Sequence, residues 1–270
     1  MTVEKARSQM KYIIKRDWYT ILERVLGYDQ VSLLTHPGRI LNQAELDALQ
    51  GVATRYLKGE PVEYILNTGF FMGMEFYVDP HVLIPREDTE CLVEEVLAHI
   101  KSQGTQTLLD MCTGSGCIAI SLGKMAGSPQ QITAVDISQD ALAIAEKNAR
   151  THAVDITFIQ SDLFAGISHK VDVIVSNPPY IATEVIATLA PNVKDHEPML
   201  ALDGGVTGLD FYQRLAKESK DYLTDTGKIF MEIGYDQGEL VKNLFLRYNY
   251  RNVQVKQDLT GLDRMVIAAV

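Results

Sequence analysis

The sequence predicts an α/β protein in which a mostly parallel sheet carries helices on both faces and follows a small helical domain. Two observations predict this fold. Strand-like apolar runs alternate with helical stretches from Arg86 onward, whereas the first 60 residues show helical periodicity alone. In addition, 270 residues with 46% hydrophobic and 22% charged residues suffice for one large domain and a smaller one.

The first 60 residues predict helices. Ahead of Gly27, a typical helix stop, apolar residues recur at helical spacing: Trp18, Ile21, Leu22, Val25 and Leu26. Asn42 can cap a second helix, because Glu45 is placed three residues on to reach back to it, and this helix ends at Gly59. We interpret residues 1–60 as a helical bundle that is either purely structural or a docking module for a macromolecular substrate.

Between Pro61 and Pro85 the period changes. Residues Gly69–Gly73 and Met74–Val78 predict two short strands around a glycine turn. We therefore expect a β-hairpin linker over residues 61–85 and the α/β domain over residues 86–270.

Within the α/β domain, seven apolar runs predict strands. They are Gln106–Met111, Ile132–Ile137, Ile156–Gln160, Val171–Ser176, Lys228–Ile233, Val253–Lys256 and Met265–Val270. Helical stretches fall between most of them, including Ser138–Arg150 with Ser138 as its cap. This alternation predicts a parallel sheet whose ligands bind at the carboxyl ends of the strands.

A glycine-containing loop follows the first of these strands. It reads Asp110-Met111-Cys112-Thr113-Gly114-Ser115-Gly116 and leads into an apolar helix. The glycines alone also fit a dinucleotide-binding pattern. A carboxylate at Asp110 suits a cofactor with a cationic end, such as S-adenosylmethionine, and would repel a pyrophosphate. Alternatively, Asp110 only fixes the loop through backbone N–H groups.

Acidic residues also follow the next two strands. Asp136, with Ile137 beside it, is expected to bind ribose hydroxyls. Asp162 can accept from the adenine amine, while Leu163 and Phe164 offer apolar surface to the ring. Each acid alone could be a turn residue or a cap. Three acids after three successive strands predict an adenosyl cofactor.

The fourth strand runs into the tetrapeptide Asn177-Pro178-Pro179-Tyr180. A proline turn that merely ends a strand explains the two prolines but not the flanking Asn and Tyr. A planar nitrogen is a poor nucleophile, and two acceptors, the Asn177 side-chain oxygen and the Pro178 carbonyl, can bind its two N–H groups. Tyr180 would pack against the planar group. The sequence therefore predicts methylation of a planar nitrogen.

The predicted transfer depends on positioning and uses no metal ion. No strong base is required before the methyl group moves. His196 and Glu197 are candidates to take the proton afterwards, although the prediction does not depend on them.

The order of these motifs resembles a known family. The series is Pro61–Ile65, Leu83–Glu90, the loop after Asp110, Asn177–Ile181, Glu197-Pro198, Leu202–Gly205, Gly208-Leu209 and Glu232–Gly234. It resembles the peptide chain release factor N5-glutamine methyltransferases, also called PrmC or HemK, over nearly the whole chain. The resemblance implies a Rossmann-like, seven-stranded class I methyltransferase domain and methylation of the glutamine in the Gly-Gly-Gln motif of class I release factors. It also implies that Asn177, Pro178, Pro179 and Tyr180 hold that glutamine.

Two positions depart from the family pattern. Cys112 stands where the family usually has the first glycine of its loop, and Glu87-Asp88 replaces the more usual Pro-Glu. Because a residue with a Cβ avoids left-handed backbone, we expect Cys112 to change the geometry of the loop or its affinity for the cofactor.

The net charge of −10 argues against nucleic acid as a partner. The open alternatives are N-methylation of adenine or guanine in nucleic acid, a non-catalytic adenosyl-binding module and an NAD-dependent oxidoreductase. With Cys91, Cys112 and Cys117 as its only cysteines, no apolar run long enough to span a bilayer and no signal sequence, the chain is expected to be cytoplasmic and away from the membrane.

Overall fold

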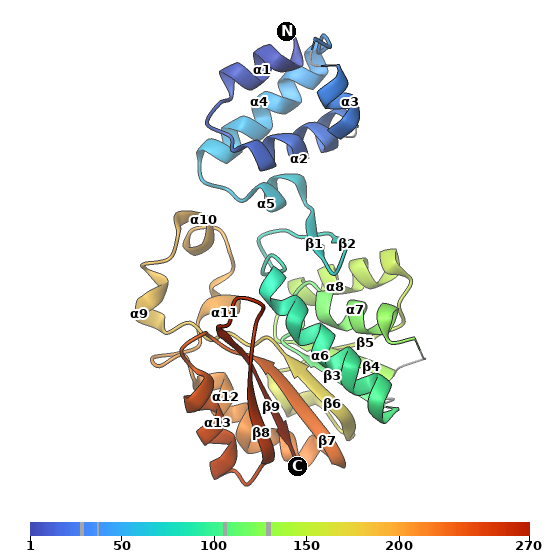
Figure 1. Ribbon diagram of the computed structural model, residues 1–270, viewed down its shortest axis with the longest axis vertical. Helices are drawn as coiled ribbons and strands as arrows, with labels where there is room; N and C mark the ends of the chain where they lie inside the picture. The colour runs from blue at the N-terminus through green and yellow to red at the C-terminus, as the bar shows by residue number, and fades with distance from the viewer. Residues whose placement is uncertain (28–29, 37, 105–106, 128–130) are drawn as a thin grey trace. The chain divides into compact units, whose positions relative to one another are not determined.

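The computed structural model describes residues 1–27, 30–36, 38–104, 107–127 and 131–270. The chain packs as two compact units (Figure 1). One comprises Met1–Thr68 with Ala190–His196, and the other comprises Gly69–Leu189 with Glu197–Val270. Our division at residues 60 and 85 stays a prediction.

The first unit is built from helices. These are α1 (Val3–Gln9), α2 (Lys15–Leu26), α3 (Gln30–Thr35), α4 (Gln43–Leu57), α5 (Val62–Leu66) and α10 (Pro191–Lys194). As predicted, Gly27 ends α2 with φ 66°, in the left-handed region that favours glycine. Asn42 and Glu45 form the predicted capping box at α4, which satisfies two backbone N–H groups. Trp18, Ile21 and Leu22 are buried in its core.

A β-hairpin opens the second unit. Strand β1 (Gly69–Phe71) pairs antiparallel with β2 (Met74–Phe76). The turn residues Met72 and Gly73 have φ of 50° and 71°, as a tight hairpin turn between twisted strands requires. The Met72 N–H donates to Glu90 Oε1 at 2.5 Å, which fixes the turn against the following helix.

The second unit is centred on the predicted seven-stranded sheet. Its strands are β3 (Thr107–Met111), β4 (Gln131–Asp136), β5 (Thr157–Gln160), β6 (Val171–Ser176), β7 (Leu223–Glu232), β8 (Arg251–Gln257) and β9 (Asp263–Ala269). Their order is β5-β4-β3-β6-β7-β9-β8. Strand β9 runs antiparallel to its neighbours β7 and β8, and the other pairs are parallel. The sheet is therefore mostly parallel, as predicted.

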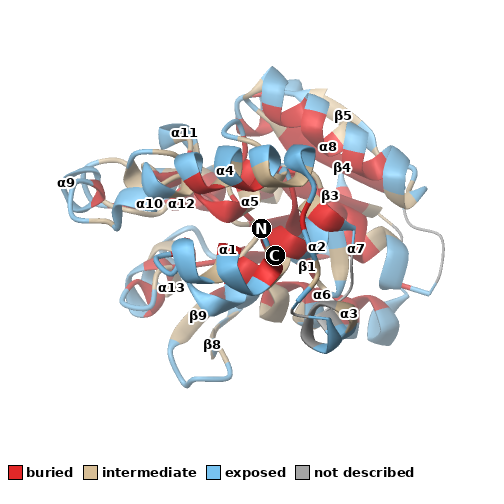
Figure 2. Ribbon diagram, turned by 90° about the horizontal axis from the view of Figure 1, so that it is seen from above, coloured by how far each residue is buried: buried red, intermediate tan, exposed pale blue. Residues whose placement is uncertain are grey.

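Helices cover both faces of this sheet (Figure 1). One face packs against α6 (Glu87–Gln103), α7 (Cys117–Met125) and α8 (Gln139–His152), and the other against α12 (Asp210–Glu218) and α13 (Gly238–Arg247). Neighbouring strand residues enter opposite cores, because side chains alternate along a strand: Leu108 joins the α6 side and Leu109 the α12 side. In Figure 2, α7 and α8 each present a buried face and an exposed face.

Strand order reverses between β3 and β6, whose carboxyl ends lie side by side. At such a point the loops diverge to opposite faces and leave room for a ligand. Short elements gather in the connections of this unit. They are η1 (Leu163–Gly166), α9 (Thr183–Ile186), α11 (Met199–Leu202) and η2 (Ser219–Tyr222).

Strand limits differ from the prediction at several ends. Gln106, our first residue of the first strand, lies outside the described residues. The largest difference is β7, which begins at Leu223 rather than at Lys228. Residues 224–227 are polar and end in glycine, so they do not extend the apolar run on which the predicted strand rests. Leu223 nevertheless pairs with Val171 across an irregularity in the register of β6 and β7. None of the described helices has the length and apolar character needed to cross a membrane.

Candidate active site

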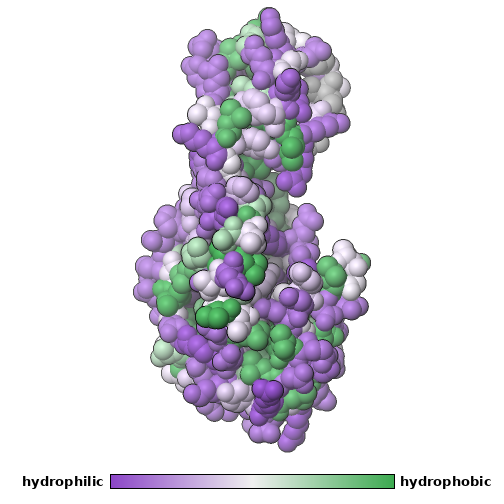
Figure 3. All heavy atoms as spheres, turned by 90° about the vertical axis from the view of Figure 1, so that its left-hand side faces the viewer, coloured by the Kyte–Doolittle hydropathy of each residue, from purple (hydrophilic) through white to green (hydrophobic). Residues whose placement is uncertain are grey.

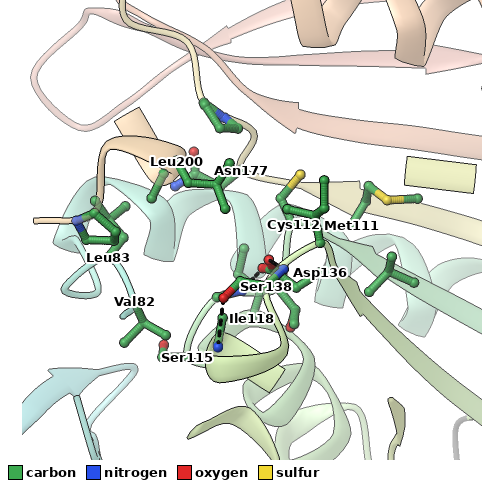
Figure 4. A pocket seen from close by; sticks show the side chains of 18 of the residues that line it. Val82, Leu83, Met111, Cys112, Ser115, Ile118, Asp136, Ser138, Asn177 and Leu200 are labelled. Carbon is green, nitrogen blue, oxygen red and sulfur yellow. Dashed lines mark hydrogen bonds between the residues drawn. The ribbon is translucent and has the colours of Figure 1, made fainter. Parts of the chain in front are cut away.

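The larger unit holds a cavity of about 410 Å³ at the carboxyl edge of the sheet. Cofactor sites commonly measure roughly 300–1,000 Å³. The predicted residues that line it are Cys112, Thr113, Gly114, Ser115, Asp136, Ile137, Asp162, Leu163, Asn177 and Pro179. The predicted residues outside its lining are Asp110, Gly116, Pro178 and Tyr180. Asn177 lies across the cavity from Asp136 and Ser138 (Figure 4).

The loop between β3 and α7 is held by backbone contacts. Thr113 N–H donates to the Val135 carbonyl at 2.9 Å, which ties the loop to the neighbouring strand. Gly116 has φ 80°, and a Cβ there would lie 3.1 Å from the Ala145 Cβ on α8. Gly116 therefore supports the loop through close helix packing and does not line the cavity.

Cys112 does not avoid left-handed backbone, and this part of our expectation is wrong. Its φ is 63°, in the region that a Cβ disfavours by roughly 1–2 kcal/mol. The residue is half-buried at the cavity wall and packs against the core beneath α12. The loop thus keeps the turn that a glycine would make, at the expense of local strain.

Asp110 lies beneath the loop, in β3, and is 1% exposed. Its Oδ2 accepts from Thr113 Oγ1 at 2.6 Å and from Ala119 N at 3.2 Å. Its Oδ1 is buried and has no partner within the described part of the chain. Burial raises the pKa of Asp110 to about 7, against the lowering effect of these two hydrogen bonds. The carboxyl group therefore fixes the loop through Oδ2 and leaves Oδ1 available to another donor.

Replacing Asp110 with asparagine is expected to flatten the dependence of stability on pH. The folded-state pKa is raised from 3.8 to about 7, so the stabilisation is complete below the unfolded value and is lost as pH rises through the folded value. A shift of this size corresponds to about 4 kcal/mol at most. Urea unfolding at about pH 5 and about pH 8 measures the difference between the two proteins. An equally steep dependence in both would contradict this role of Asp110.

Asp136 ends β4 and faces the cavity. Its Oδ2 accepts from Gly114 N at 2.9 Å, and its Oδ1 accepts from Ser138 N at 3.0 Å. Partial burial raises its pKa, while these backbone bonds oppose the shift. The carboxylate thus joins the glycine loop to the start of α8 and presents acceptors suited to hydroxyl donors.

Asp162 and Leu163 form the third part of the cavity. Asp162 Oδ1 pairs with Arg214 Nη1 of α12 at 2.7 Å, with both side chains substantially exposed. Leu163 has φ 49°, so its backbone too is in the strained left-handed region. Arg214 lines the cavity, and nothing in the sequence pointed to it because it lies on an ordinary amphipathic helix.

Asn177 is oriented by residues far away in the chain. Its Nδ2 donates to Thr89 Oγ1 at 3.2 Å, and Thr89 Oγ1 donates to Glu232 Oε2 at 2.5 Å. Tyr180 donates its hydroxyl to the other oxygen of Glu232 at 3.2 Å. Because the amide nitrogen is engaged, the Asn177 Oδ1 remains the group available to a ligand in the cavity. Sequence reasoning assigned no role to Thr89 or Glu232.

The tetrapeptide is supported from behind by residues 202–208. Gly204 N–H donates to the Ile181 carbonyl at 2.8 Å. A Cβ on Gly204 would lie 2.7 Å from the Tyr180 Cα, and one on Gly208 would lie 2.4 Å from the Tyr180 carbonyl oxygen. Only glycine fits this close approach, so these two positions fix the course of the chain after Pro179.

The two candidate bases lie in different surroundings. Glu197 is buried and forms an ion pair with Arg86, whereas His196 groups with the first unit. Neither residue lines the cavity. Further residues to which the sequence analysis assigned no role in the site also line the cavity. They include Pro80–Leu83, Pro85, Pro198, Leu200-Ala201 and Phe211.

Comparisons with known proteins identify the family. Residues 13–66 match the PrmC N-terminal domain, and residues 88–193 match the methyltransferase small domain. The release factor glutamine methyltransferase of Geobacter sulfurreducens is 40% identical over 265 residues, which cover 98% of this chain and 89% of that protein. The chain belongs to the release factor glutamine methyltransferase family. Another member, from Thermodesulfovibrio yellowstonii, is 36% identical over 274 residues, which cover 97% of this chain and 97% of that protein.

Among solved structures, a T. thermophilus 16S rRNA methyltransferase in complex with AdoMet and guanosine is 16% identical, with a TM-score of 0.54. The match covers 75% of this chain and 49% of that one, and it shows the fold alone. Family membership confirms the predicted resemblance, the predicted class of fold and the predicted cofactor, S-adenosylmethionine.

The residues present fit that cofactor. The buried, unpartnered Oδ1 of Asp110 and the carboxylate of Asp136 offer acceptors near a cavity of suitable volume. A sulfonium cofactor carries positive charge, which both carboxylates favour.

Proposed function

We propose that this chain methylates the side-chain amide nitrogen (N5) of the glutamine in the Gly-Gly-Gln motif of class I peptide chain release factors. One observation carries the proposal. The Asn177 side chain lies at the cofactor cavity with its nitrogen bonded to Thr89, so that its oxygen is available to an N–H donor. Family membership supports release factors as substrates, since the relatives bear that name.

The proposed role of Asn177 and Pro178 is to hold the acceptor amide. The Asn177 Oδ1 would accept one N–H and the Pro178 carbonyl the other, which fixes the plane of the amide. Both bonds strengthen as positive charge develops on nitrogen. Pro178 suits this role because its ring restricts φ and holds the carbonyl in place. Pro179 and Tyr180 would complete the pocket, with the Tyr180 hydroxyl fixed on Glu232.

S-adenosylmethionine, when bound, supplies an electrophilic methyl group. In the proposal, residues Cys112 to Gly116 support its aminoacyl part, with Asp110 beneath them. Asp136 and Ile137 hold its ribose, while Asp162 and Leu163 hold its adenine. Asn177 lines the same cavity as these residues, which supports transfer between two ligands bound side by side.

A protein substrate accounts for further features of the surface. Apolar side chains lie among hydrophilic ones on the face of the larger unit in Figure 3. In α11, Met199 and Leu200 are 52% and 53% exposed, and Leu200 also lines the cavity. Exposed apolar groups beside a site favour contact with another protein. We further propose that residues 1–60 dock the release factor, and that the enzyme acts in the cytoplasm, where its free cysteines stay reduced.

Methylation of an intact release factor tests the proposal. With labelled S-adenosylmethionine, the wild-type factor is expected to gain label and a factor with Gly-Gly-Glu in place of Gly-Gly-Gln is not. Equal labelling of both factors would exclude the glutamine as acceptor. A parallel reaction with ribosomal RNA tests the nucleic-acid alternative, because label in RNA would favour it. Removal of residues 1–60 is expected to impair methylation of the whole factor more than that of a short peptide.

A further inference from the structure

A chain of hydrogen bonds through the buried side chains of Thr89 and Glu232 links the acceptor site to a strand end. We propose that Thr89 and Glu232 are positioning residues for methyl transfer, which set the orientation of the Asn177 amide so that its oxygen faces the acceptor nitrogen. The inference rests on the proposed function and assigns it two residues outside the acceptor tetrapeptide. They lie 88 and 55 positions from Asn177 in the sequence.

The geometry supports a one-way arrangement of donors. A carboxamide carries an oxygen that accepts and a nitrogen that donates. Rotation by half a turn about the Cβ–Cγ bond exchanges the positions of these two atoms. Thr89 Oγ1 has one proton, and it lies 2.5 Å from Glu232 Oε2. Because that proton forms the hydrogen bond to the carboxylate, Thr89 Oγ1 can only accept a hydrogen bond from its other neighbour. The amide nitrogen of Asn177, 3.2 Å away, is the group that can donate to it.

Burial makes this arrangement hard to reverse. Thr89 is 2% exposed and Glu232 1%, so water does not compete for their bonds. If the Asn177 amide were turned, its oxygen would face Thr89 Oγ1, and its nitrogen would face the donors of the substrate amide. Two donors would then oppose each other at the acceptor site, which forfeits the hydrogen bond and leaves a buried group unsatisfied.

The anchor of the chain is Glu232. Its two oxygens accept from Thr89 and from Tyr180, and the ionised carboxylate accepts both hydroxyl protons without carrying a proton that it must donate itself. Titratable and charged groups of other elements also face it, namely Asp88 from α6, Cys117 from α7 and Arg264 from β9. Tyr212 from α12 donates to its backbone carbonyl. Burial raises the pKa of Glu232 to about 7, against lowering by Thr89, Tyr180 and Arg264. The arrangement is therefore expected to strengthen as pH rises through neutrality.

The test compares Thr89→Val, which has the same shape but no hydroxyl, with Thr89→Ser, which keeps the hydroxyl. Thr89→Val is expected to lower kcat for a Gly-Gly-Gln peptide by about 10- to 100-fold, since small misplacements in a site have effects of this size. Its Kd for S-adenosylmethionine should stay within about 3-fold of wild type, and Thr89→Ser should recover most of kcat. The wild-type rise of kcat around pH 7 is expected in Thr89→Ser and not in Thr89→Val.

Thr133→Val, the same change at a buried position in β4 outside the cavity lining, serves as the control for folding. A kcat of Thr89→Val within about twofold of wild type, or a Thr89→Ser as slow as Thr89→Val, would overturn the inference. Nuclear magnetic resonance of the Asn177 side-chain amide gives a readout without substrate. The Nδ2 proton that bonds Thr89, assigned with Asn177→Ala, should be shifted downfield in wild type and should lose that shift in Thr89→Val. Should wild type methylate neither the intact release factor nor the peptide, the proposed function fails, and the amide spectrum alone still decides whether Thr89 orients Asn177.

Discussion

Asn177→Ala is expected to reduce kcat for methylation of a release factor by roughly 10²–10³-fold, comparable to removal of one preorganised hydrogen-bonding group from other enzymes. The physical reason is that the substrate amide loses the acceptor that holds one N–H and favours the charge on nitrogen. Thr89 loses its donor at the same time. Steady-state kinetics with whole factor measure the effect on methyl transfer, and calorimetry measures the effect on binding of S-adenosylmethionine.

The loss should appear mainly in kcat. The Kd for S-adenosylmethionine is expected to change by less than about 5-fold, because Asp136 and the loop after β3 remain intact. Asn243→Ala, the same change at an exposed position on α13, is the matched control and should behave like wild type. A kcat for Asn177→Ala within about 10-fold of wild type would remove Asn177 from the proposed acceptor site.

Asp136→Ala is expected to weaken binding of S-adenosylmethionine by about 100-fold or more, because hydrogen bonds to a charged group are worth roughly 1.5–3 kcal/mol each. Two effects combine. The ribose hydroxyls lose their proposed acceptor, and the N–H groups of Gly114 and Ser138 lose theirs, which loosens the loop. Isothermal titration with S-adenosylmethionine or its demethylated product measures the affinity directly.

The matched control for this prediction is Asp140→Ala. Asp140 is exposed in the first turn of α8, so its removal changes net charge equally without touching the cavity lining. Its Kd should stay within about 3-fold of wild type. If Asp136→Ala bound the cofactor as tightly as Asp140→Ala, the assignment of Asp136 to the ribose would be wrong.

Much of the fold follows from local patterns. Strand β6 was predicted to the residue, because Val171–Ser176 is an apolar run bounded by a polar segment and the first proline. The start of β7 could not be predicted, since Thr224 to Gly227 are polar and Leu223 before them joins the strand only through its pairing with Val171 of β6. The caps at Asn42 and Ser138 were predictable because capping depends on residues three positions apart.

The site was predictable where it follows strand ends and unpredictable where it depends on contacts across the fold. Asp136 ends β4 and Asn177 directly follows β6, and the carboxyl ends of these strands share one edge of the sheet. Thr89 and Glu232 stand in motifs of the family resemblance. The hydrogen bonds from Asn177 to Thr89 and from Thr89 to Glu232, however, exist only once α6 and β7 pack around β6. The backbone conformation of Cys112 could not be predicted from the residue type. The surrounding loop holds it in the left-handed region, which a residue with a Cβ disfavours.

The position of the transferred methyl group tests the account most directly. A release factor is incubated with the enzyme and S-adenosylmethionine and digested, and tandem mass spectrometry of the Gly-Gly-Gln peptide locates the added mass. The account predicts one methyl group on the glutamine side-chain nitrogen, absent when Asn177→Ala replaces the wild-type enzyme. An unmodified glutamine, or a methyl group on any other residue of the factor, would contradict it.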